Sequence, residues 1–324
     1  MLLFHTALVD SYLRFGTRGY VLPESYQNIA DKIYNMPVRS DDVWVVTFPK
    51  SGTTWVQELV WMVANDCDFA KSAEIKLIQR FPFLEFTVLY DNDKGRDLLD
   101  QMSKSEDEDL ILISKNMSRC SVEKVKNISS RRFIKTHVPL SLLPPQLLDT
   151  CKVVYVARDP RDVAISYFHH CKLTNTTRFT GDLKEFWNYF INNLVFAAPV
   201  IEHVKEAWEL RHHKNMLFLF YEDLLKDLPK GIKQVADFLG KNLTEEQVSR
   251  LSDHLTFENF KKNKSVNYEF MKDLNIFSKD ESFVRKGKSG GWREQFDDEM
   301  KQQAERWIQE GLRGSSLRYP DTQS

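Results

Sequence analysis

One stretch decides the expected fold of this chain: Val43-Trp44-Val45-Val46-Thr47-Phe48-Pro49-Lys50-Ser51-Gly52-Thr53-Thr54-Trp55. Residues 43–48 are apolar or β-branched and are followed by a proline, a pattern that predicts a buried strand. After the Ser51-Gly52 turn, apolar side chains recur at helical spacing up to residue 63, so a helix is expected to begin at residue 53. The stretch therefore predicts a strand, a tight turn and a helix N-terminus in direct succession.

This succession is suited to binding an anion. Backbone N–H groups and the positive end of a helix dipole point at the turn, and Lys50 adds a full charge. The hydroxyls of Ser51, Thr53 and Thr54 add hydrogen-bond donors without bulk. Lys50 precedes Gly52, whereas the lysine of the P-loop nucleotide signature follows its glycine, so an ordinary ATPase site is disfavoured. The alternative is a strand, turn and helix whose Lys50 only faces solvent.

Three further short apolar runs, residues 132–136, 151–157 and 216–220, are expected to form strands. Asp159-Pro160 has the pattern of a helix N-cap followed by proline at the first helical position, and Thr244 to Gln247 form a capping box. Strands separated by helical stretches predict an α/β fold with a central, mostly parallel sheet flanked by helices. We expect a single domain over residues 1–324, with residues 1–25 as an N-terminal segment.

The composition excludes several classes of protein. With 42% hydrophobic residues the chain can bury a sizeable core, and 45 basic against 46 acidic residues leave no overall field for nucleic acid or an acidic membrane. No apolar run reaches the roughly 18 residues that span a bilayer. The four cysteines and eight histidines show no metal-ligand spacing, so structural thiols, no bound metal and a cytoplasmic location are expected.

Five stretches together resemble the cytosolic sulfotransferase family. They are Thr47 to Trp55, Lys135-Thr136-His137, residues 155–167, Tyr221-Glu222-Asp223, and Arg285-Lys286-Gly287 with Gly290-Gly291-Trp292. They occur in the family's order and span about residues 40 to 295. The resemblance implies transfer of a sulfuryl group from 3′-phosphoadenosine 5′-phosphosulfate (PAPS), leaving adenosine 3′,5′-bisphosphate (PAP), without a metal.

The resemblance also assigns a donor site in two halves. It implies that the phosphosulfate end and the adenine side are bound by Lys50, Ser51, Gly52, Thr53, Thr54 and Trp55; that the 3′-phosphate is held by Arg158, Ser166, Arg285, Lys286 and Gly287; and that Tyr221, Thr256 and Phe257 lie near the adenine. Arginine offers a fork of donors suited to phosphate, and lysine a compact charge. The alternatives are a surface ion pair of Arg158 with Asp159 or Asp162, and a solvated basic turn at 285–287.

His137 is the expected catalytic base. It follows a predicted strand, and a neutral imidazole is a suitable base near neutral pH. The reaction would be an in-line displacement at sulfur in which the acceptor oxygen attacks and PAP leaves. Lys50 and Lys135 would stabilise the charge that grows on the leaving bridge oxygen.

An aromatic pocket is expected for the acceptor, a small hydrophobic alcohol such as a phenol, a steroid or a retinoid-like alcohol. The resemblance places Phe83, Phe86 and Tyr268 there beside Lys135 and His137. His170 stands where the family usually has an aromatic residue. An apolar cleft with one polar reactive group fits such an acceptor, although the rings could instead be plain core.

Two departures from the family pattern leave alternatives open. Residues 87–132 are longer than the corresponding loop and form a candidate lid over the acceptor site, with a charged, solvated part at 103–109. The family's short dimer pattern is not recognisable after Trp292, so a monomer and a homodimer both remain open. The long loop resembles the insect branch, which includes a retinol dehydratase. Dehydration of an allylic alcohol and non-catalytic donor binding are therefore alternatives, whereas a nucleotide kinase lacks its glycine arrangement and acidic metal site.

Overall fold

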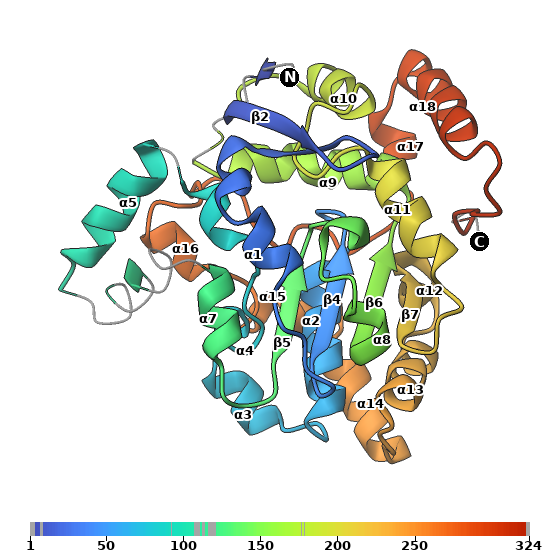
Figure 1. The fold of residues 1–324 in the computed structure, drawn as a ribbon. Coiled ribbons are helices and arrows are strands. Elements are labelled where there is room, and N and C mark those ends of the chain that lie inside the picture. The colour runs from blue at the N-terminus through green and yellow to red at the C-terminus, as the bar shows by residue number, and fades with distance from the viewer. Residues whose placement is uncertain are drawn as a thin grey trace.

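The computed structural model describes residues 4–6, 9–91, 93–106, 111, 114–115, 121–175, 177 and 179–321. Its centre is a four-stranded sheet in the order β5 (Phe133–Thr136), β4 (Val43–Thr47), β6 (Lys152–Ala157) and β7 (Met216–Phe220) (Figure 1). All three pairs of neighbouring strands are parallel. The four predicted strands and the predicted α/β fold class are confirmed.

Helices cover both faces of this sheet because side chains alternate along each strand. Val43 and Val45 of β4 pack with α2 (Thr53–Ala64), α13 (Leu228–Leu239), α14 (Glu245–His254) and α15 (Phe257–Lys262). Trp44 and Val46 face the other side and pack with α9 (Pro160–Leu173), α10 (Leu183–Ile191), α11 (Val200–Glu209) and α18 (Asp298–Gly311). The sheet is therefore buried on both faces, which accounts for its nearly continuous apolar sequence.

The predicted helix starts at Asp159 and Thr244 are also confirmed. The Asp159 side chain accepts a hydrogen bond from the backbone N–H of Arg161, with Pro160 as the first residue of α9. Thr244 and Gln247 form the expected reciprocal capping box at the start of α14. Both caps satisfy N–H groups that the first helical turn leaves without an intrahelical partner.

The remaining elements lie around this core. The N-terminal segment forms a small antiparallel sheet of β1 (Phe4–Thr6), β2 (Val9–Phe15) and β3 (Tyr20–Pro23), which residue patterns had not indicated. Short helices complete the fold: η1 (Glu24–Asn28), α1 (Ala30–Tyr34), α3 (Phe69–Glu74), α4 (Leu77–Arg80), η3 (Leu140–Leu142), α8 (Leu147–Thr150), α12 (Tyr221–Lys226), α16 (Phe270–Asp273) and α17 (Trp292–Gln295). Among the described residues, no helix is long and apolar enough to cross a membrane.

Residues 87–132, predicted as a long loop and candidate lid, contain helical elements in the structure. They include most of η2 (Phe86–Leu89) and the helices α5 (Asp93–Ser103) and α7 (Ser121–Asn127). Leu98, Leu99 and Met102 lie on one face of α5 and pack with residues around α16. Helices α5 and α16 lie together at one side of the molecule (Figure 1). The apolar spacing in α5 was hidden among charged residues. Of the predicted solvated part, Ser103 ends α5 and residues 107–109 lie outside the described residues.

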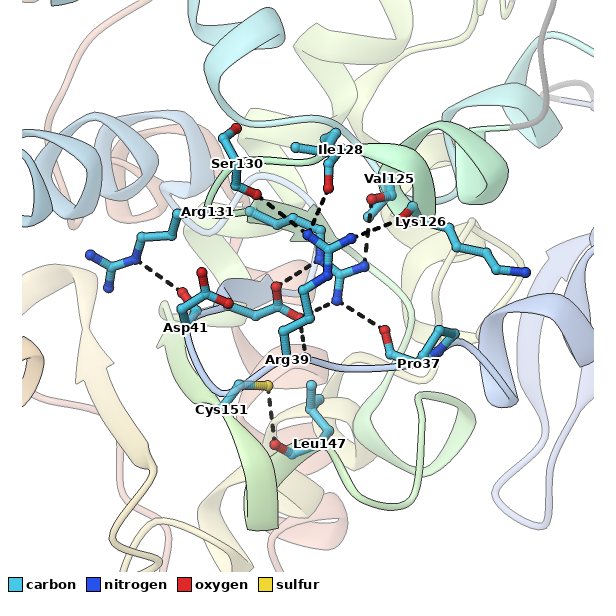
Figure 2. Close-up of polar contacts among 12 residues, drawn as sticks. Pro37, Arg39, Asp41, Val125, Lys126, Ile128, Ser130, Arg131, Leu147 and Cys151 are labelled. Atoms are coloured by element: carbon cyan, nitrogen blue, oxygen red, sulfur yellow. Dashed lines mark hydrogen bonds and ion pairs between the residues drawn. The ribbon is translucent and has the colours of Figure 1, made fainter.

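Both ends of this insertion are fixed to the core. At its base, Thr87 Oγ1 lies 3.1 Å from Ser121 Oγ, which also donates to the carbonyl oxygen of Leu84. At the end of α7, the Arg39 guanidinium donates to the carbonyl oxygens of Lys126 at 3.0 Å and Ile128 at 2.6 Å (Figure 2). An arginine is well suited to this position because the last carbonyls of a helix have no intrahelical partner.

Candidate active site

The predicted site residues follow strands whose carboxyl ends meet at one edge of the sheet. The chain connects β4 to β5 on one side and β6 to β7 on the other, so the connections diverge between β4 and β6. In open α/β sheets, ligands bind in the crevice at such a point. A cavity of about 690 Å³ lies there, lined by the turn after β4, by His137 after β5 and by Arg158 after β6.

Most of the predicted residues line this one cavity. They are Lys50, Gly52, Thr53, Thr54, Trp55, Phe83, Phe86, Lys135, His137, Arg158, Ser166, His170, Tyr221, Phe257, Tyr268, Arg285, Lys286 and Gly287. Two predicted residues are not among the lining residues. Ser51 is buried, and the exposed Thr256 donates its hydroxyl to the carbonyl oxygen of Asp253 at 2.8 Å.

The turn after β4 is shaped by its contacts with Tyr221. Gly52 has φ of 98°, and a Cβ atom there would lie 2.6 Å from the Tyr221 ring, so both the backbone conformation and the space require glycine. Lys50 also adopts a positive φ, 66°. At the start of α2, Trp55 Nε1 donates to the carbonyl oxygen of Leu255 at 2.9 Å. These contacts hold the turn in the form that aims the helix N-terminus at the cavity.

Arg158 joins the two halves of the predicted donor site. Its Nη1 donates to the carbonyl oxygen of Lys50 at 3.3 Å, and its Nη2 donates to that of Lys288 at 3.0 Å. The guanidinium lies over the Tyr221 ring, 4.5 Å from its centroid. The alternative ion pairs are not formed, because the Asp159 carboxylate pairs with Arg161 and that of Asp162 accepts from Ser289. Arg158 therefore faces the cavity.

His137 is held as a neutral imidazole. Its Nδ1 lies 2.8 Å from the carbonyl oxygen of Thr47. Because a carbonyl oxygen only accepts, this contact assigns the ring proton to Nδ1 and leaves the lone pair on Nε2. Behind the ring, His203 Nε2 donates to the carbonyl oxygen of His137 at 3.0 Å. The geometry therefore provides an imidazole with a fixed orientation and a fixed tautomer.

Comparison with known proteins decides the family. The sulfotransferase domain family matches residues 40–316. The chain belongs to this family. It is similar to luciferin sulfotransferase of Photinus pyralis, with 32% identity over 95% of this chain and 81% of that protein.

Solved structures agree. Retinol dehydratase in complex with androsterone and inactive cofactor PAP has 46% identity and a TM-score of 0.90, covering 97% of this chain and 93% of that one. Its complex with retinol and PAP has 45% identity, the same TM-score and the same coverage. The chain is thus a sulfotransferase, and both of these similar structures were solved with PAP bound.

The cavity of this sulfotransferase concentrates positive charge. Burial, with a further contribution from Lys135, lowers the pKa of Lys50 to about 7. Burial and the nearby Arg158 also lower the pKa of Arg285. Cations held together away from water are stabilised by an anion, so this distribution favours a ligand with several negative charges.

Glu85 is a functional residue that sequence reasoning missed. Its carboxylate is buried and accepts from Thr136 Oγ1 at 2.7 Å and from the backbone N–H of His137 at 2.6 Å. Burial raises the pKa of Glu85 and lowers the pKa of Lys135, while the attraction between the two groups opposes both shifts. An acidic residue inside the apolar stretch 81–86 was the available signal. Glu85 fixes the strand end that presents Lys135 and His137.

Aromatic side chains form the rest of the wall. Phe83 lies with its ring centroid 5.2 Å from that of His137 and 4.2 Å from Lys135 Nζ. Phe283, which was not predicted, lies 4.5 Å from Lys50 Nζ and packs against Tyr268. Burial, with a smaller contribution from the charge of Lys50, lowers the pKa of His170 well below its ordinary value. This part of the wall is thus mostly aromatic, and the imidazoles of His137 and His170 are among its polar groups.

Proposed function

We propose that this sulfotransferase transfers the sulfuryl group of PAPS to the hydroxyl of a small hydrophobic acceptor, with His137 as the base. The observation that supports this most directly is the tautomer of His137, whose Nε2 lone pair is left free by the bond from Nδ1 to Thr47. The same cavity contains Lys50 and Lys135 and is walled by phenylalanine and tyrosine rings. A phenol, a steroid alcohol or a retinoid-like alcohol has the corresponding chemistry.

The proposed reaction is a single displacement. His137 Nε2 takes the proton of the acceptor hydroxyl as the oxygen forms a bond to sulfur. The bond between sulfur and the bridging oxygen breaks, and that oxygen leaves with its electron pair on PAP. Lys50 and Lys135 face the charge that develops there. The products are the sulfate ester, PAP and the proton held by His137.

The donor residues are proposed to act in two groups. Residues 50–55 would bind the phosphosulfate end, while Arg158, Ser166 and residues 285–287 would hold the 3′-phosphate. Tyr221, Thr256 and Phe257 would lie near the adenine. The bridging position of Arg158 between the carbonyl oxygens of Lys50 and Lys288 supports this division.

The test of this function is a titration followed by an acceptor panel. We expect PAP to bind at micromolar concentrations in isothermal titration calorimetry, and PAPS to support sulfation of apolar alcohols or phenols. Adenosine triphosphate is the control nucleotide, because it lacks the 3′-phosphate. Absence of PAP binding at micromolar levels would contradict the donor site.

A second candidate reaction is donor-dependent dehydration of an allylic alcohol such as retinol. The observation that favours it is the 46% identity to retinol dehydratase over 97% of the chain. In that reaction the allylic sulfate ester would lose sulfate and a proton to give an anhydro compound. Analysis of the product formed from an allylic alcohol separates the two, since only transfer leaves a stable sulfate ester.

We further propose that residues 87–132 include a lid over the acceptor site. Leu89, Tyr90 and Arg96 line the cavity, and Met102 of α5 is buried against residues around α16. A lid formed by these residues would lie between the acceptor end of the cavity and solvent. A lid of this kind would favour hydrophobic acceptors by excluding water from them.

Met102→Asp tests the lid, because it places a charge in the contact between α5 and the α16 region. Burying a methionine side chain contributes about 1.5–3 kcal/mol, so the KM for a hydrophobic acceptor is expected to rise by about 10- to 100-fold. PAP affinity should not change. Gln101→Asp introduces the same charge at an exposed neighbour and serves as the control. An unchanged acceptor KM in Met102→Asp would refute the lid.

We also propose a cytoplasmic location. Cys67, Cys151 and Cys171 are buried and unpaired, as expected of thiols in a reducing compartment. Cys120 lies outside the described residues. Recovery of the protein in the secreted or membrane fraction of cells would contradict this location.

A further inference from the structure

The segment that carries Arg285, Lys286 and Gly287 has no helix or strand between residues 279 and 291. It is attached to the core instead by the carboxylate of Asp162, in the first turn of α9. Asp162 Oδ2 accepts from Ser289 Oγ at 2.8 Å and from the backbone N–H of Gly290 at 2.6 Å. Its Oδ1 accepts from the backbone N–H of Trp292 at 3.2 Å. One side chain thus binds the end of the segment at Ser289 and Gly290 and the first residue of α17, Trp292.

The surroundings of Asp162 strengthen this attachment. Asp162 is only 4% exposed, so its hydrogen bonds are protected from competing water. Hydrogen bonds to a carboxylate are stronger than those between neutral groups. Its place in the first turn of α9 puts the negative charge at the positive end of the helix dipole. Burial, the hydrogen bonds and the helix N-terminus therefore all favour a carboxylate side chain at this position.

Neighbouring groups reinforce the same geometry. Glu222 Oε1 accepts from the backbone N–H of Asp159 at 2.9 Å and lies 3.3 Å from Ser289 Oγ. On the other side of the segment, Gly287 has φ of 60°, and a Cβ atom there would lie 2.4 Å from the Phe257 ring. The segment is therefore held between Phe257 and two carboxylates.

The charges explain why the segment needs an anchor. Arg285 faces Arg158, and the pKa of Arg285 is lowered in part by that repulsion. Without a donor, the repulsion between cations on the two halves of the site would favour an open segment. Asp162 opposes this by binding Ser289, Gly290 and Trp292, which closely follow Gly287 in the chain.

We propose that Asp162 is a positioning residue for donor binding, which keeps residues 285–287 where they meet the 3′-phosphate before the donor arrives. The proposal rests on the donor site proposed above and adds a residue that is not itself expected to touch the donor. The proposal predicts an effect that depends on the 3′-phosphate of the ligand. Loss of Asp162 should weaken ligands that have a 3′-phosphate and leave ligands without one unaffected.

The experiment compares two nucleotides in isothermal titration calorimetry: PAP, and adenosine 5′-monophosphate, which lacks the 3′-phosphate. Asp162→Ala is expected to weaken PAP binding by about 10- to 100-fold, the effect of losing hydrogen bonds to a charged group, with little effect on the monophosphate. Ser289→Ala should give a smaller loss, because it leaves the two backbone bonds to Asp162. At saturating PAPS, the kcat and the acceptor KM of Asp162→Ala should match those of the wild type.

Two controls make the outcome decisive. Asp182→Ala removes the exposed N-cap carboxylate of α10 and should change neither titration. If Asp162→Ala does not fold, Asp162→Asn and Ser289→Ala carry the test, because each keeps part of the attachment. Equal weakening of both nucleotides, or unchanged PAP binding, would overturn the role of Asp162. Failure of the wild type to bind PAP would instead overturn the donor site itself.

Discussion

We expect His137→Ala to lower kcat by about 10²- to 10⁴-fold, the usual contribution of a positioned general base. The Nε2 lone pair would be lost from a site where the bond from Nδ1 to the Thr47 carbonyl oxygen has fixed its direction. PAP affinity should change little, because the imidazole is proposed to act on the acceptor. Single-turnover formation of the sulfated product with bound PAPS measures the effect on the chemical step.

His212→Ala is the matched control for this variant. His212 is exposed and lies outside the cavity, so its replacement should leave turnover unchanged. A His137→Ala enzyme with wild-type turnover would eliminate His137 as the base. A loss of PAP binding equal to the loss of turnover would indicate that the variant damages the donor site instead.

The same histidine predicts a pH dependence. Burial and the nearby Lys135 hold the pKa of His137 well below its usual value of 6.5. The neutral form is the proposed base, so kcat should not fall as the pH is lowered from 7.5 to 6.5. A group whose pKa is depressed on folding binds a proton on unfolding, so its contribution to folding stability is lost as the pH falls below about 6.5. A decrease in kcat with an apparent pKa near 6.5 would contradict the buried neutral state.

The second large effect is expected for Lys50. Lys50→Met keeps the length of the side chain but removes the charge that we propose stabilises the leaving oxygen. By comparison with other positioned electrostatic donors, the loss is about 2–4 kcal/mol of transition-state stabilisation, or about 30- to 1,000-fold in kcat. Lys214→Met, at an exposed position outside the cavity, is the matched control and should leave kcat unchanged. Wild-type turnover in Lys50→Met would refute the assignment.

Lys50 should also couple donor binding to protons. Burial and Lys135 lower its pKa to about 7 in the free protein, so part of the population is neutral at and above that pH. A bound anion favours the charged form and raises this pKa. PAP binding should therefore take up a proton and weaken as the pH rises through about 7. Titration in two buffers of different ionisation enthalpy measures this uptake, which Lys50→Met should lack.

Some parts of the protein were readable from local sequence. The apolar runs before Pro49 and before Asp159 predicted buried strands because a strand covered on both faces needs no polar alternation. The turn after β4 was predicted as an anion site because a helix N-terminus, a glycine and a lysine act within a few residues of one another. The charged pattern of the insertion, in contrast, concealed α5, whose apolar face is defined only by its packing near α16.

The opening stretch thus determined by itself the strand, the turn, the helix and the chemistry of an anion site, because all four arise from contacts between close neighbours. Only the tertiary structure decided how that site is completed. The proton of His137 is placed by Thr47, 90 residues away, and Asp162 holds a segment more than 120 residues further along. Such contacts depend on strand order and helix packing, which set distances between parts of the chain that no local pattern relates.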